Sequence, residues 1–216
     1  MNKTFLTTKL TPIIAVILCC MLYASGYFQM MIAALLFLVA SYIEYKKELF
    51  SSLGFQRKNL NAKNLLIVAP LLGIAIFLFS AHVSMPVITY FTNQPIDYST
   101  FEQYEGNLSA LSILFVYMIF SAAFGEEIVF RGYLMRQFTK FFGSSKISLV
   151  INILLFGIIF GYSHAYQGIT GVITTCITGM LFAFIFHLRK YDLWFNVVLH
   201  GFINTVGFVY IYYGWI

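Results

Sequence analysis

The sequence predicts an all-α fold, a polytopic membrane helix bundle with about seven transmembrane helices. Of its 216 residues, 60% are hydrophobic and only 10% are charged, whereas a soluble domain carries about 25% charged residues. Apolar runs recur along the whole chain, and each approaches the ~20 residues that cross about 30 Å of hydrocarbon. So few charges cannot supply the polar surface that a globule needs in water, which favours a membrane protein.

Seven apolar segments are expected to form the helices, in chain order 11–25, 28–44, 65–83, 108–130, 147–163, 168–188 and 193–213. Pro12 suits the first turn of the first helix, whereas Pro70 is expected to bend the third. The longest polar stretches are 45–64 and 84–107. The basic and apolar residues of 45–64 predict either a helix on the membrane surface or a solvated connector.

The N-terminal segment allows two interpretations. Lys3 and Lys9 precede an apolar run that ends near Ser25, an arrangement similar to that of a signal peptide. A second apolar run begins at Phe28, directly after the first. This favours a retained helical hairpin over cleavage.

The positions of the basic residues predict the orientation. With seven crossings, one side receives twelve of the thirteen Lys and Arg residues: Lys3, Lys9, Lys46, Lys47, Arg57, Lys58, Lys63, Arg136, Lys140, Lys146, Arg189 and Lys190. The opposite side receives the 84–107 loop, whose charges are Asp97, Glu102 and Glu105. The positive-inside rule then places the N-terminus in the cytoplasm. We expect a multi-pass protein of the cell (plasma or inner) membrane, surrounded by lipid and without a nucleic-acid partner.

Three charged residues lie at the end of the fourth apolar segment. Glu127 and Arg131 are four residues apart and therefore share one face of a helix. Glu126 is rotated by about 100° from Glu127 and is expected to face something else. A purely structural ion pair would explain Glu127 and Arg131 but not Glu126. Ionisable groups in hydrocarbon normally pair with each other or line a wet cavity.

Polar residues in two later segments complete the candidate site. His164 ends the fifth segment, where an interfacial polar group is the alternative interpretation. His200 and Asn204 lie one turn apart within the last segment and need partners inside a membrane. Gly157 and Gly161 form a G-x-x-x-G pattern, which predicts close helix packing. Helix bundles build catalytic and metal sites from such residues on separate helices.

These residues resemble the CPBP family of membrane CAAX proteases and bacteriocin-processing enzymes. That family carries E-E-x-x-x-R, F-x-x-x-H and H-x-x-x-N in this order, and this sequence reads Glu126-Glu127-Ile-Val-Phe-Arg131, Phe160-Gly-Tyr-Ser-His164 and His200-Gly-Phe-Ile-Asn204. The resemblance covers 108–207 as a CPBP-like catalytic core. Residues 1–107 show only generic apolar helices and loops, and 1–216 is interpreted as a single membrane domain.

The resemblance implies hydrolysis of a peptide bond in a membrane-associated peptide or protein. Glu126 would be the general base for water, with His164 positioning it, while His200 and Asn204 would donate hydrogen bonds to the oxyanion. Glu127 and Arg131 would hold these groups in place. The alternative chemistry is a zinc ion bound by Glu126, His164 and His200.

Two other functions remain open at this stage, a non-catalytic bacteriocin-immunity or peptide-binding protein and a transporter with Glu126 as proton carrier. The sequence also poses a geometric problem. Seven simple crossings would place Glu126 toward one membrane surface and His164 toward the other, well over ~10 Å apart at 1.5 Å per residue. A single long helix from about 108 to 141 would bring Glu126 nearer to the middle of the membrane.

Overall fold

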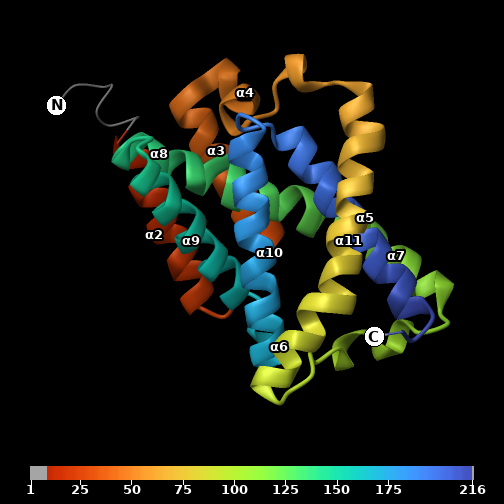
Figure 1. Cartoon of the computed structure of the whole chain (residues 1–216). Helices are drawn as coiled ribbons and strands as arrows, with labels where there is room; N and C mark the ends of the chain where they lie inside the picture. The colour runs from red at the N-terminus through yellow and green to blue at the C-terminus, as the bar shows by residue number, and fades with distance from the viewer. Residues whose placement is uncertain (1–8, 216) are drawn as a thin grey trace.

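The computed structural model describes residues 9–215, and Lys3 therefore lies outside the described residues. All regular elements in that range are helical, which confirms the all-α class (Figure 1). The helices before the candidate site are α2 (Thr11–Ala24), α3 (Met30–Tyr45), α4 (Leu49–Leu53), α5 (Ala69–Phe79) and α6 (Met85–Thr92). Those that follow are α7 (Leu108–Met118), the π-helical η7 (Ile119–Leu134), α8 (Met135–Phe142), α9 (Lys146–Tyr162), α10 (Gly168–Leu188) and α11 (Leu193–Tyr212).

Four continuous helices within 9–215 are long and apolar enough to cross a membrane, namely Asn64–Thr92, Leu108–Phe142, Ala165–Leu188 and Leu193–Tyr212. The chain is therefore a multi-pass membrane protein. The apolar helices α2 and α9 are shorter, with 14 and 17 residues. At 1.5 Å per residue, α9 measures about 25 Å, less than the ~30 Å of the hydrocarbon core. The expected total of seven crossings stays a prediction.

The third apolar segment is longer than expected. The helix continues from Asn64 to Thr92, so the prediction that a polar stretch begins at residue 84 was wrong. Residues 85–91 are mostly apolar and can remain in hydrocarbon. The helix ends at Asn93, which adopts the left-handed conformation with φ of 52°. The π-helical turns η4 (Asn64–Val68) and η5 (Ser80–Ser84) precede Pro70 and Pro86, because proline removes a helical N–H and crowds the preceding turn.

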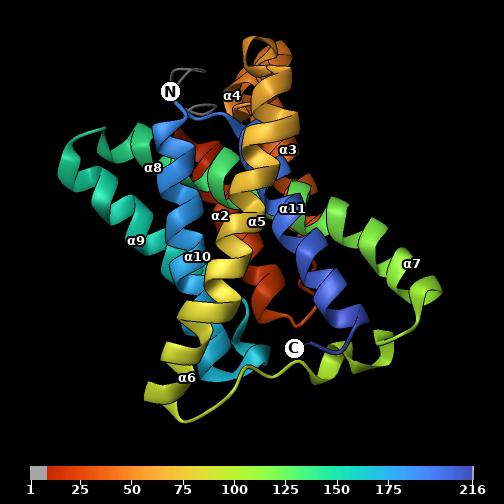
Figure 2. The same cartoon turned by 45° about the vertical axis from the view of Figure 1, so that its right-hand side comes forward.

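The fourth apolar segment belongs to one helix of 35 residues, Leu108–Phe142. This confirms the single long helix and corrects the segment end at residue 130. The helix runs obliquely across the bundle from α7 to α8 (Figures 1 and 2). Its central part, η7, has π-helical bonding, and the Met135 N–H reaches the Phe130 carbonyl five residues earlier. Glu126 therefore lies near the midpoint of the helix rather than near its end.

The carboxylate of Glu44 fixes the C-terminal half of this long helix to α3. It accepts hydrogen bonds from the Tyr133 hydroxyl at 2.7 Å and from the Gln137 amide at 3.0 Å. Lys140 Nζ lies 2.8 Å away and pairs with the same carboxylate, whose side chain is fully buried. The three partners are spaced i, i+4 and i+7, so they project from one helical face. This contact positions the π-helical segment that carries the candidate site.

The two ends of the bundle differ in charge. The end with α4, α8 and the α10–α11 connection carries Lys46, Lys47, Arg136, Lys140, Arg189 and Lys190 (Figure 1). The segment 93–107, at the end with α6 and the C-terminus, carries Asp97, Glu102 and Glu105. The residues of 45–64 form short helical turns, including α4, rather than one long surface helix. Leu53 of α4 is buried in the bundle.

Close packing of α9 on α10 depends on glycine, as the G-x-x-x-G pattern predicted. A Cβ atom added at Gly161 would lie 2.6 Å from the Val172 carbonyl oxygen, and one at Gly157 would lie 3.1 Å from the Met180 nitrogen. Neither backbone atom can move aside without displacing α10. The spacing of these helices therefore sets the position of His164 at the end of α9.

We expect Gly161→Ala to destabilise the protein by about 1–3 kcal/mol, the usual cost of overpacking. The measurement is thermal unfolding of the purified protein in detergent. Gly201→Ala is the matched control, because a Cβ there would meet its nearest neighbour, Ile119 Cδ1, at an ordinary 3.6 Å. Equal stability of the two variants would contradict the role assigned to Gly161.

Candidate active site

Glu127 is the most highly connected polar residue of the candidate site, and it is fully buried. Its Oε1 accepts a hydrogen bond from Arg131 Nη1 at 3.1 Å and lies 3.0 Å from His200 Nδ1. Its Oε2 accepts from the amide of Asn196 at 3.3 Å. The carboxylate thus joins the long helix to α11 at two successive turns. The pairing with Arg131 is the one that the spacing predicted.

Arg131 extends the same network to α10. Its side chain is buried, and Nη2 donates to the Gly179 carbonyl at 3.0 Å. The guanidinium also lies over the ring of Phe160, 4.6 Å from the centroid, and over that of Phe182 at 5.2 Å. Aromatic faces attract a cation, and these contacts replace the water that a buried arginine loses. The three helices that carry the sequence motifs are held together at this point.

Glu126 faces a different direction from Glu127, as expected, although the local helix is π rather than α. Its Oε2 lies 3.9 Å from His200 Nε2. That oxygen is buried and, among the residues with described positions, has no hydrogen-bond partner. Because His200 Nδ1 faces the acceptor Glu127, a proton belongs on Nδ1. The imidazole is thereby oriented so that Nε2 points to Glu126.

His164 is held in a similar way at the end of α9. Its Nδ1 lies 2.9 Å from the Phe160 carbonyl oxygen, which can only accept. The proton of the neutral ring is therefore on Nδ1, and Nε2 makes no hydrogen bond within the described residues. The Phe160 ring contacts both histidines, with centroid distances of 5.0 Å to His164 and 6.3 Å to His200.

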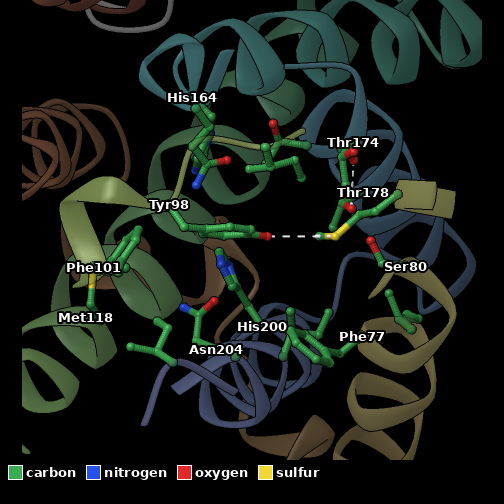
Figure 3. A pocket seen from close by; sticks show the side chains of 18 of the residues that line it. Phe77, Ser80, Tyr98, Phe101, Met118, His164, Thr174, Thr178, His200 and Asn204 are labelled. Atoms are coloured by element: carbon green, nitrogen blue, oxygen red, sulfur yellow. Dashed lines mark hydrogen bonds between the residues drawn. The ribbon is translucent and has the colours of Figure 1, made fainter. Parts of the chain in front are cut away.

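One cavity brings several predicted residues together. His164, His200 and Asn204 line it, with His164 and His200 on opposite sides of Tyr98 in the view of Figure 3. Burial raises the pKa of Tyr98 to about 12, so its phenol stays neutral. Asn204 Nδ2 is buried and finds no partner within residues 9–215. The cavity therefore has an imidazole on two sides and an unused amide donor.

Asn196 was missed by the sequence reasoning. It is fully buried and donates both to Glu127 and to the Phe182 carbonyl, at 3.3 and 3.1 Å. The signal was present in the sequence, because Asn196, His200 and Asn204 are spaced by four residues and form a polar stripe on one face of an apolar helix. The stripe begins one turn earlier than the H-x-x-x-N motif.

The zinc alternative does not fit this arrangement. Over the described range, no three His, Cys, Asp or Glu side chains gather closely enough to hold a metal ion. Glu126 and His200 approach each other, but His164 is not grouped with them as a third ligand. The roles considered below are therefore those of the side chains themselves.

We expect Arg131→Met to destabilise the fold by about 3–5 kcal/mol, because it leaves the buried Glu127 charge without its cation. The double variant Glu127→Met/Arg131→Met removes both charges and should recover part of that loss. Thermal unfolding in detergent measures both. Lys47→Met is the control, since Lys47 is exposed and forms no ion pair among residues 9–215, so its replacement should change stability by about 0.5 kcal/mol or less. A double variant less stable than Arg131→Met would contradict the ion-pair interpretation.

Residues 108–206 match the family model described as "Rce1-like: Type II CAAX prenyl endopeptidase Rce1-like". No curated protein and no solved structure matches the chain. The matched range contains the long helix with its two glutamates, both histidines and both asparagines of the site. A membrane protease family is consistent with a cluster of Glu126, Glu127, Asn196 and His200 that lies among membrane helices. Residues 108–206 are a domain of the Rce1-like type II CAAX prenyl endopeptidase (CPBP) family, a family of membrane proteases.

Proposed function

We propose that the protein is an intramembrane endopeptidase that hydrolyses a peptide bond in a membrane-associated peptide or protein. The observation that carries this proposal is the pair formed by Glu126 and His200. A buried carboxylate oxygen without a hydrogen-bond partner among the described residues lies 3.9 Å from an imidazole nitrogen. That imidazole is oriented by Glu127 and lines a cavity. The carboxylate of Glu126 is therefore suited to accept a proton from a water molecule.

In the proposed mechanism, Glu126 takes one proton from water while the oxygen attacks the carbonyl carbon of the substrate. The tetrahedral intermediate carries a negative charge on the former carbonyl oxygen. When the carbon–nitrogen bond breaks, Glu126 returns the proton to the leaving amine. The Asn204 side-chain amide, whose Nδ2 has no partner among the described residues, is available as a donor to the oxyanion.

His200 can assist as the second oxyanion donor when it is protonated. In that state Nδ1 donates to Glu127 and Nε2 donates toward Glu126 and the cavity. The charges of Glu126, Glu127, Arg131 and His200 then sum to zero. Charge neutrality lowers the cost of holding four ionisable groups in an apolar bundle.

The remaining residues have supporting roles in this proposal. His164 positions the water or the substrate from the other side of the cavity through Nε2, the ring nitrogen that does not face the Phe160 carbonyl. Glu127 and Arg131 hold the orientation of His200 and the spacing of the three helices. Residues 108–207 would form the catalytic core, and residues 1–107 would contribute the surrounding helices.

We further propose that the protein lies in the plasma or inner membrane of the cell, crosses it seven times and has its N-terminus in the cytoplasm. The four long helices would make four of these crossings, and the shorter helices α2, α3 and α9 would make the other three. The charge difference between the two ends of the bundle supports this orientation through the positive-inside rule.

We expect Glu126→Gln to abolish cleavage, a loss of at least about 10²-fold, because glutamine cannot accept the proton from water. The measurement compares N-terminal fragments in membranes from cells that express the wild type or the variant at equal levels. Glu48→Gln, which changes an exposed carboxylate just before α4, is the control and should behave like the wild type.

Full cleavage by Glu126→Gln would reject the catalytic proposal. If the variant also keeps its biological effect on cells, a peptide-binding or bacteriocin-immunity role would replace it. Thermal unfolding of the variant must match that of the wild type, so that a loss of cleavage reports on chemistry.

A further inference from the structure

Helix α10 carries four threonines, and three of them have hydrogen-bond partners. Thr170 donates to the Gln94 carbonyl at 2.5 Å, and Thr178 donates to the Thr174 carbonyl at 3.0 Å. Thr175 bonds to the Gly171 carbonyl four residues earlier. A threonine in an apolar helix normally satisfies its hydroxyl in this way, through the carbonyl of the preceding turn.

Thr174 is the exception. It is 5% exposed, and its Oγ1 has no hydrogen-bond partner in the described part of the chain. Burying a hydroxyl without a partner destabilises a protein, and more so where no water competes. A valine of the same shape would avoid this penalty. The structure therefore retains at this position a polar atom that the fold does not use.

The position of Thr174 relates it to the proposed chemistry. Its side chain lines the same cavity as His164, His200 and Asn204 (Figure 3). The cavity is otherwise largely apolar, with Ile76, Phe77, Met118, Ile203, Phe208 and Ile211 among its lining residues. Asn204 Nδ2 is the other fully buried side-chain polar atom on this lining that lacks a hydrogen-bond partner within the described residues. Two buried polar atoms without partners thus occur in the wall of a largely apolar cavity.

A peptide segment that enters such a cavity needs hydrogen-bond partners for its backbone. Cleavage requires an extended segment, and an extended backbone in an apolar environment exposes N–H and C=O groups that helical bonding no longer satisfies. An apolar wall can pack against the substrate side chains but cannot bond its backbone. A threonine hydroxyl can donate to a carbonyl or accept from an N–H.

We propose that Thr174 is a substrate-binding residue whose hydroxyl bonds the backbone of an extended peptide beside the cleaved bond. The substrate segment would carry apolar side chains at the positions that meet the wall formed by Phe77, Ile203 and Phe208. This inference rests on the proposed function, since it assigns the substrate contacts of the same site. It adds a residue outside the three sequence motifs.

The test uses Thr174→Val, which keeps the shape and removes the hydroxyl, and Thr174→Ser, which keeps the hydroxyl. The probe is a synthetic peptide that spans the cleavage site most dependent on Glu126 in membranes, assayed with the full chain in proteoliposomes. We expect Thr174→Val to raise KM about five- to tenfold, the effect of one neutral hydrogen bond, with kcat within about twofold. Thr174→Ser should stay near the wild type.

Thr175→Val and Thr178→Val are the matched controls, because both line the cavity but bond their own helix. If Thr174 only supports the fold, Thr174→Val should unfold at a lower temperature than the wild type. If the hydroxyl serves the substrate, Thr174→Val unfolds at the same temperature as the wild type or higher, while its KM rises.

An unchanged KM in Thr174→Val, with cleavage still dependent on Glu126, would overturn this inference and leave the proposed function intact. An equal rise of KM in Thr175→Val would overturn it too, since the effect would then be general to the helix. If no fragment in membranes depends on Glu126, the proposed function itself fails, and the substrate-binding role fails with it.

Discussion

The buried carboxylate of Glu127 is the group on which the geometry of the site depends. It binds Arg131 on its own helix and both Asn196 and His200 on α11, while Arg131 reaches the Gly179 carbonyl on α10. Removing either charge would leave the other buried without a counterion, which is strongly unfavourable in a low-dielectric interior. The network therefore constrains the relative positions of three helices and the direction of one imidazole ring.

The polar groups of the site differ in their hydrogen bonding. Glu127 and Arg131 have close polar partners on neighbouring helices, and the Asn196 amide nitrogen donates to two acceptors, although its oxygen has none within residues 9–215. Glu126 Oε2, Asn204 Nδ2 and Thr174 Oγ1 are buried and lack a partner among residues 9–215. Asn204 and Thr174 line the cavity that both histidines share, and Glu126 lies beside His200. Unsatisfied polar atoms reduce stability, so groups of this kind beside a cavity are candidates for a role in binding or reaction rather than in folding.

The apolar pattern predicted the helices better than it predicted their ends. All seven segments are helical, and the Gly157–Gly161 spacing correctly indicated close packing. The end near residue 83 was wrong because hydropathy places a boundary at a few polar residues, whereas helix α6 continues to Asn93 through an apolar stretch. The π-helical geometry of Ile119–Leu134 could not be predicted, since α and π bonding use the same residues and differ only in register.

The sequence by itself determined that the chain is an all-α membrane protein, because hydropathy and charge are local properties that each segment carries alone. It also determined that Glu127 and Arg131 pair, since residues four apart share a helical face. Only the tertiary structure decided that Asn196 supports Glu127, that Glu126 lies beside His200, and that Thr174 shares a cavity with both histidines. Those relations join residues on different helices, and they depend on the tilt, depth and rotation that packing imposes on each helix.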